Sequence, residues 1–351
     1  MKRFLTTIIA CAALCAGAAA QEPATSNVPV TRIGIIGLDT SHSIAFTKYL
    51  NDKASLEPEV LRYEVVIAYP YGTQTIESAA SRIPKYIDEI QNYGVKIAGS
   101  IEQVISQSDL IFIETNDGRM HFEQALEVFK SGKKVYIDKP LGSTLGETIA
   151  IFRLAEKYGT KTFSSSSIRF AQQNQDLRNG VYGDVKGADI FSPHHPEPTH
   201  PDFGYYGIHG VEGLFTVMGT GCQEVTRIHS SEGDICVGVW EDGRLGTFRA
   251  ITTGPNIYGG TAITSKKKAV PAGNYDGYKP LVKAIINFYE TGNLPVSPEE
   301  TIEIFTFMKA SNMSLKQGGK PVKMSAALKA GEKDADKILK ALEKAEQAAS
   351  K

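Results

Sequence analysis

The 351-residue chain is short of both cysteine and net charge. Only two of its four cysteines, Cys222 and Cys236, lie beyond residue 20, and two cysteines do not make a disulfide framework. They could pair in an oxidising compartment, and two free buried thiols are the alternative. Lys and Arg number 38 and Asp and Glu 39, for a formal net charge of -1. This balance does not indicate a nucleic-acid partner or an acidic membrane surface.

The chain also lacks an apolar run long enough to cross a bilayer, so we predict no transmembrane segment. Residues 1–20 begin with MKR, continue through the apolar FLTTIIACAALCAG and end in AAA. This pattern predicts a secretory signal peptide and export to the periplasm or cell envelope. Lipoprotein processing at Cys11 is the second interpretation. Residues 1–20 are therefore left out of the fold.

Short apolar strands alternate with helical segments between residues 31 and 167. The helical segment 75–94 contains Pro84, which should break or kink it. The alternation predicts an α/β fold, a Rossmann-like doubly wound parallel sheet with ligands at the carboxyl ends of its strands. The expected strands are 32–37, 62–69, 95–99, 109–114, 134–138 and 161–167.

A different pattern follows residue 168. Strand-like runs separated by glycine-rich turns come first, and the helical segments 278–292 and 297–319 come later. We expect an α+β domain over 168–330 with a largely antiparallel sheet. Residues 331–351 are rich in Lys, Glu and Ala and should form a surface helix or a frayed tail.

The turn after the first strand lacks two of the glycines that a dinucleotide fingerprint needs. GIIGLDTSH, residues 34–42, keeps Gly37 but has Asp39 and His42 at the second and third glycine positions of G-x-G-x-x-G. A carboxylate at Asp39 would repel a diphosphate by roughly 4 kcal/mol if the charges came within about 4 Å. The cofactor survives if Asp39 points away and the Thr40 and Ser41 hydroxyls face the phosphates.

Residues 109–170 carry a set of motifs. The first strand ends in Thr115-Asn116, and His121 and a helix ending in Gly132-Lys133 follow. The next strand ends in Asp138-Lys139-Pro140. As a set, these motifs resemble the glucose-fructose oxidoreductase / inositol dehydrogenase family (Gfo/Idh/MocA). Asp138 shortens the family's Glu-Lys-Pro glutamate, and the resemblance runs through most of residues 31–220.

The resemblance implies NAD- or NADP-linked oxidation or reduction of a sugar, a polyol or a related compound, in a protein that could form a homo-oligomer. It places Lys139 between cofactor and substrate. The family's D-x-G-x-H-x-x-D motif aligns with YYGIHGVE, which makes Tyr205 and His209 candidate catalytic residues together with Lys139. The candidate substrate-binding residues are Arg169, His195 and Glu212, and the candidate cofactor-binding residues are Gly34, Gly37, Thr40, Ser41, Thr115, Asn116 and Lys139.

Four of the seven histidines fall within residues 192–212. His209 and Glu212 are three apart, on one helix face, and His194 and His200 lie on a proline-rich loop that limits their freedom. These four residues could hold Zn²⁺ or a similar divalent ion. The competing interpretation is that His209 and Glu212 bind sugar hydroxyls while the loop histidines border the pocket.

Three functions follow from these features. The first is a sugar, polyol or glycoside oxidoreductase with tightly bound NAD(P), in which His209 is the general base and Lys139 polarises the substrate oxygen. Tight binding is needed because free NAD(P) belongs to the cytoplasm. The second is a cofactor-free, metal-assisted carbohydrate lyase or hydrolase on the same scaffold. The third is a sugar-binding protein of the cell envelope without catalytic activity.

Overall fold

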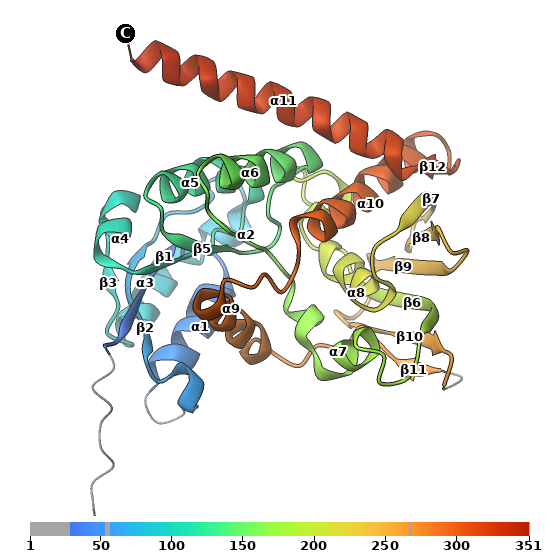
Figure 1. The fold of residues 1–351 in the computed structure, drawn as a ribbon, viewed down its shortest axis with the longest axis horizontal. Coiled ribbons are helices and arrows are strands. Elements are labelled where there is room, and N and C mark those ends of the chain that lie inside the picture. Colours follow the sequence, from blue (N-terminus) through green and yellow to red (C-terminus); the bar gives the residue numbers. More distant parts are fainter. Residues whose placement is uncertain (1–28, 53–56, 267–268, 351) are drawn as a thin grey trace, which may run out of the picture.

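Five parallel strands form the first sheet, in the order β3-β2-β1-β4-β5 (Figure 1). The computed structural model describes residues 29–52, 57–266 and 269–350, so the predicted signal peptide lies outside the described residues. The order reverses between β1 and β4, which is where α/β sheets bind ligands. The strands are β1 (Thr31–Ile36), β2 (Tyr63–Tyr69), β3 (Lys96–Ile97), β4 (Leu110–Ile113) and β5 (Lys134–Ile137).

Both faces of this sheet are buried, as the apolar strands predict. Ile33 and Ile35 of β1 pack with α1, α3 and α9, whereas Ile36 packs with α4, α5 and α6. The helices are α1 (Ser41–Asn51), α2 (Glu77–Ala80), α3 (Ile83–Gln91), α4 (Ile101–Gln107), α5 (Gly118–Lys130) and α6 (Leu145–Lys157), and the turn η1 spans Pro58–Val60. The segment around Pro84 is divided between α2 and α3, and Pro84 lies in the first turn of α3, where its missing N–H costs no hydrogen bond.

The predicted strand at 161–167 is wrong. These residues run beside β5, where the Ile137 N–H donates to the Phe163 carbonyl over 3.3 Å and the Thr162 hydroxyl donates to the Val135 carbonyl over 3.0 Å. They make no regular strand ladder, and the chain turns into η2 (Ser167–Phe170) instead. The serine-rich sequence provides side chains that bond to nearby groups in place of the ladder.

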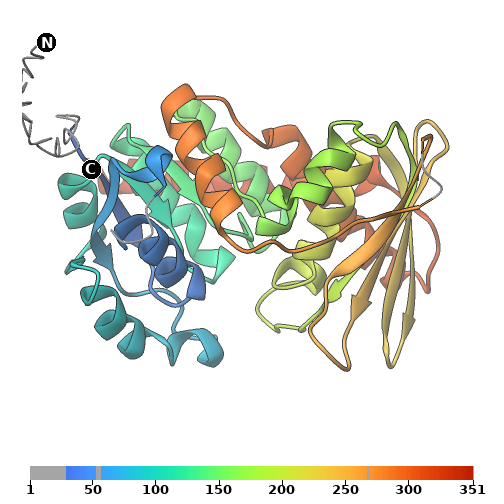
Figure 2. The same ribbon diagram turned by 90° about the horizontal axis from the view of Figure 1, so that it is seen from below.

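The second sheet has the order β11-β10-β6-β9-β8-β7-β12. Only β6 and β9 pair in parallel within it, which confirms the expected largely antiparallel sheet. Figure 2 shows the two sheets side by side, with helices between them. The elements of this half are α7 (Gln172–Arg178), β6 (Val185–Pro193), η3 (Asp202–Gly204), α8 (Ile208–Met218), β7 (Cys222–Ser230), β8 (Gly233–Trp240), β9 (Leu245–Ile251), β10 (Gly259–Thr264), β11 (Val270–Pro271) and β12 (Val322–Lys323).

Three long helices complete the described chain, namely α9 (Lys279–Thr291), α10 (Pro298–Lys316) and α11 (Met324–Ala349). Helix α9 returns to the first sheet, where the Tyr289 hydroxyl donates to the Ile111 carbonyl over 2.6 Å. Helix α11 crosses α6 (Figure 1), and Gly331 lies against Leu145 at the crossing. The C-terminal segment is therefore a helix that starts before residue 331, and the tail alternative is wrong.

Cys222 and Cys236 are both buried and are not joined by a disulfide, which answers the question that the sequence left open. Within the described ranges, no helix combines the length and the apolarity that a bilayer crossing requires.

Candidate functional site

The turn after β1 keeps its tight geometry. Gly37 has φ 98°, and a Cβ there would lie 2.7–2.8 Å from backbone atoms of Thr115, so glycine is required. Gly34 lies inside β1, and a Cβ there would meet Val104 and Ser108. The predicted role of Gly34 in cofactor binding is therefore corrected to helix–strand packing.

Asp39 points away from the cavity. Its carboxylate is fully buried and accepts the backbone N–H of Thr73 over 2.8 Å and that of Asn116 over 2.9 Å. Burial raises the pKa of Asp39, although these two hydrogen bonds oppose the rise. The side chain thus ties the loops after β2 and β4 beneath the turn, and Gly72 leaves room for it.

The start of α1 is open to a cavity of about 490 Å³. Thr40 caps the helix by accepting the N–H of His42, and both Thr40 and Ser41 line the cavity. A volume of this size is ordinary for a small-molecule site. The other lining residues come from both halves of the chain, and they are His42, Ser78, Arg82, Asn116, Lys139, Ser167, Ile168, His195, Tyr205, Tyr206, His209, Tyr258, Tyr275 and Tyr278.

Three predicted site residues from the second half face this cavity. The Tyr205 hydroxyl accepts a hydrogen bond from the Asn116 amide over 2.7 Å, so it connects the two halves. The His195 ring packs edge-on against Tyr206. His209 bonds through Nδ1 to the Ser166 hydroxyl over 2.7 Å. Burial, with Lys139 and His42 nearby, lowers the pKa of His209 well below its usual value.

Arg169 and Glu212 do not line the cavity, which corrects their predicted role in substrate binding. The Arg169 guanidinium is 1% exposed and donates to Glu212 over 2.6 Å and to Glu300 over 2.8 Å. Glu212 also accepts from Ser165 and from the Ser166 N–H. This buried network joins η2, α8 and α10 and is structural.

Thr115 is also buried outside the cavity lining. Its hydroxyl accepts a hydrogen bond from the Gln124 side chain, and its carbonyl lies 2.8 Å from Nε2 of His121. Its predicted contact with a cofactor would therefore pass through the neighbouring Asn116 rather than through the Thr115 side chain.

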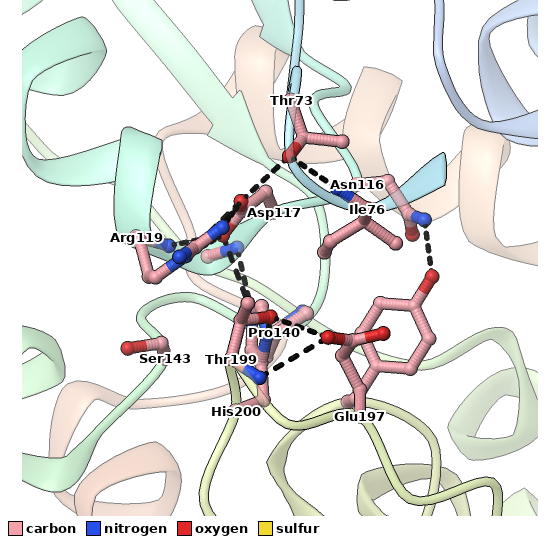
Figure 3. A network of polar contacts seen from close by, with 12 residues as sticks. Thr73, Ile76, Asn116, Asp117, Arg119, Pro140, Ser143, Glu197, Thr199 and His200 are labelled. Atoms are coloured by element: carbon pink, nitrogen blue, oxygen red, sulfur yellow. Dashed lines mark hydrogen bonds and ion pairs between the residues drawn. The ribbon is translucent and has the colours of Figure 1, made fainter. Parts of the chain in front are cut away.

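The proposed zinc ligands do not come together. His200 lies among Asp117, Arg119 and Thr199 (Figure 3), and its Nε2 accepts the Gly118 N–H over 3.2 Å. His194 instead packs edge-on against Phe203. Burial lowers the pKa of both histidines to about 4. Within the described ranges, the set with metal-like spacing is a different one, His42, Glu114 and Asp138.

Sequence reasoning missed Glu114 and the pairing of His42 with Asp138. His42 lies in the first turn of the helix after β1, Glu114 follows β4 and Asp138 follows β5, so the three meet at the strand ends. The signal was available, because titratable residues directly after adjacent parallel strands share one edge of the sheet. The sequence holds no comparable signal for the other cavity residues that sequence reasoning missed, which include Ser78, Arg82, Tyr206, Tyr258, Tyr275 and Tyr278.

A parallel sheet whose order reverses between β1 and β4, with a cavity at that point, defines a Rossmann-type fold. Residues 31–165 match the family described as "Oxidoreductase family, NAD-binding Rossmann fold" (GFO_IDH_MocA). The match to the Gfo/Idh/MocA family model covers the first domain of the chain and confirms the resemblance over these residues. Among curated protein sequences, none matches the chain.

Solved structures share the fold across both halves. A probable dehydrogenase from Thermotoga maritima has a TM-score of 0.68 and 18% identity, covering 84% of this chain and 99% of its own. A putative myo-inositol dehydrogenase from Sinorhizobium meliloti 1021 has a TM-score of 0.67 and 14% identity, and the alignment covers 84% of this chain and 100% of that protein. Scyllo-inositol dehydrogenase from Lactobacillus casei, solved with NAD(H) and scyllo-inositol, has a TM-score of 0.67 and 14% identity, and the alignment covers 84% of this chain and 99% of that protein. At these identities the likeness concerns the fold.

Proposed function

We propose that this protein is an oxidoreductase that acts on a sugar, polyol or glycoside in the interdomain cavity, with NAD or NADP held tightly. The observation that carries the proposal is the cavity itself. It brings the open start of α1, the Lys139 ammonium and the buried His209 to one space of about 490 Å³. That combination supplies a place for a diphosphate and polar groups for a substrate oxygen.

The residues at the start of α1 fit the diphosphate of a dinucleotide. Gly37, Thr40 and Ser41 would hold it, because helix N-termini bind anions and the Asp39 carboxylate is directed into the protein. The end of β2 has no carboxylate for a ribose 2′-hydroxyl, whereas Arg82 lines the cavity and would suit a 2′-phosphate. When bound, the cofactor supplies the hydride acceptor or donor.

Lys139 is the group that stabilises negative charge on the reacting oxygen. Its side chain is nearly buried yet faces the cavity, so its charge acts in a medium of low dielectric. His209 enters as a neutral imidazole, because its environment disfavours the charged form. With Nδ1 at Ser166, its Nε2 is left to hydrogen-bond a substrate hydroxyl.

The remaining walls suit a polyhydroxylated ligand. Tyr206, Tyr258, Tyr275 and Tyr278 combine an apolar ring face with a hydroxyl that bonds to polar groups. We also propose export, from residues 1–20, and a tightly held cofactor is what an exported nicotinamide enzyme requires. The metal-assisted alternative loses its ligand set, because His194, His200, His209 and Glu212 are separated.

The test uses the full chain, exported and purified without added nucleotide. Denaturing it should release NAD or NADP in near-stoichiometric amount, and a panel of sugars and polyols should change the redox state of the bound nucleotide. Lys139→Met should lower the rate of that change by 10²–10³-fold, the usual effect of losing one charge-stabilising group. Lys48→Met, at an exposed position of α1, is the matched control and should have no effect. A protein that neither retains nor binds either nucleotide would contradict the proposal.

A further inference from the structure

Two buried side chains meet at the strand ends behind the cavity. Nδ1 of His42 lies 2.7 Å from Oδ2 of Asp138, and the other oxygen of Asp138 accepts the Tyr136 hydroxyl over 3.2 Å. His42 is in the first turn of α1 and Asp138 directly follows β5, so two rigid elements hold the pair. Neither residue has a role in the function proposed above.

His42 is oriented with its free side toward the ligand. Nδ1 is bonded to Asp138, the residue lines the cavity, and among the described residues Nε2 has no hydrogen-bond partner. The ring is fixed by Phe46, stacked at 5.5 Å between centroids, and by Tyr278, edge-on at 4.7 Å. A carboxylate on one nitrogen and a ligand space at the other is the arrangement of a proton-accepting histidine.

Of the two buried carboxyl groups near His42, Asp138 is the ionised one. Burial tends to raise the pKa of Asp138, but His42 and Lys139 together lower it to about 2, so Asp138 is ionised at neutral pH. Glu114 is completely buried, its two oxygens have no hydrogen-bond partner among the described residues, and burial beside Asp138 raises its pKa well above the usual value. Glu114 is therefore neutral, and Asp138 carries the negative charge of this pair of carboxyl groups. Lys139, His209 and Tyr278 are the other titratable groups around His42.

His209 has the opposite environment. Within the part of the chain that the structure describes, no carboxylate bonds to its ring, its Nδ1 partner is a serine hydroxyl, and Lys139 is a nearby positive charge. A base must hold the proton that it removes, and His209 holds one poorly. The sequence assigned this role to His209, whereas the geometry favours the other histidine of the same cavity.

We propose that His42, oriented by Asp138, is the group that takes up the hydroxyl proton when the substrate is oxidised. This inference rests on the proposed function for the reaction. As the alcohol becomes a carbonyl, its carbon gives up hydrogen with two electrons to the nicotinamide, and its oxygen gives up a proton. The O–H bond breaks, an N–H bond forms at Nε2 of His42, and the Nδ1–H stays hydrogen-bonded to Asp138. In the reductive direction His42 returns the proton.

A metal ion at the same cluster is the competing interpretation. Ligand atoms placed about 2.0–2.2 Å from an ion such as Zn²⁺ lie more than 3 Å apart in tetrahedral geometry. The 2.7 Å separation between His42 and Asp138 is that of a charge-assisted hydrogen bond. The adjacent Lys139 ammonium also opposes a second cation.

The test is a pH titration of the histidine ring signals by NMR in the full chain without nucleotide or substrate. His42→Gln identifies the signal of residue 42. Asp138→Asn should weaken proton binding at His42 at least tenfold, one pH unit in its titration midpoint, because the ionised partner is lost. Glu114→Gln is the matched control, since it replaces a neutral group by another and should shift the midpoint far less. The His209 signal should titrate well below the usual range of a histidine, because burial and Lys139 lower its pKa.

Three results would overturn the inference. The first is a His42 midpoint that Asp138→Asn leaves unchanged, and the second is a His209 signal that takes up a proton at higher pH than His42. The third is a stoichiometric divalent ion in the purified protein that His42→Gln removes. If Asp138→Asn does not fold, Asp138→Glu, which keeps the charge, should preserve the His42 titration. Because the titration uses no nucleotide, its failure is distinct from failure of the proposed cofactor to bind.

Discussion

Asp39 shows how one side chain can replace a glycine without filling the ligand space. A carboxylate at the second glycine position is an obstacle only if it faces the diphosphate. In the structure it accepts two backbone N–H groups, from Thr73 and Asn116, and lies beneath the turn. The sequence identified the obstacle, but the direction of the side chain depends on loops that are 34 and 77 residues away along the chain.

Arg169 allows a residue-scale prediction. Arg169→Met should lower the free energy of unfolding by about 3–5 kcal/mol, because Glu212 would be left buried without its cation and Glu300 would lose one of two. Denaturant unfolding measures this loss. Arg178→Met is the control and should cost less, since the Arg178 side chain is 31% exposed. If Arg169→Met instead raised KM at unchanged stability, the original substrate-binding role would stand.

At the scale of elements, the loop 194–200 makes stability depend on pH. His194 and His200 have pKa values lowered to about 4, against about 6.5 in an unfolded chain. Below pH 6.5 the unfolded state therefore binds more protons, and the folded state loses stability until the pH reaches about 4. Each histidine contributes a slope of about 1.4 kcal/mol per pH unit. Between pH 6.5 and 4, each one alone therefore lowers the free energy of unfolding by roughly 3 kcal/mol.

The variant His200→Gln isolates this effect. Its amide oxygen can accept the Gly118 N–H that Nε2 of His200 accepts now. The free energy of unfolding of this variant should be measured in denaturant at several pH values between 7 and 4.5. Its slope with pH should be smaller than that of the unmodified protein by about 1.4 kcal/mol per pH unit, the contribution of one proton. An unchanged slope would mean that His200 is protonated in the folded state.

Local sequence patterns predicted most of the elements and less of the site. The parallel strands, the Pro84 interruption and the antiparallel second sheet follow from periodicity and turn residues, which act over short range. The prediction for 161–167 failed because this segment is joined to β5 by isolated bonds, from the Thr162 hydroxyl and from the Ile137 N–H, rather than by a regular ladder. The three predicted catalytic residues do line the cavity, namely Lys139, Tyr205 and His209. Arg169 instead forms buried ion pairs with Glu212 and with Glu300, which lies far along the chain.

At the scale of the whole molecule, the site depends on contacts between the two halves of the chain. Tyr205 of the second half bonds to Asn116 of the first, and α9 returns from the second half to cover the first sheet. The cavity is therefore lined by loops and helices next to both sheets. Its polar groups come from elements that are adjacent only in the folded chain. This arrangement is why a family resemblance could indicate the cavity while individual residue roles required the structure.

The most direct test of the account is a crystal structure of the full chain as purified from its exported form, without added ligand. We expect NAD or NADP with its diphosphate over residues 37–41, beside Thr40 and Ser41, and with Asp39 still bonded to Thr73 and Asn116. A structure that shows no nucleotide there, even after the crystal is grown with millimolar NAD and NADP, would contradict the proposed function.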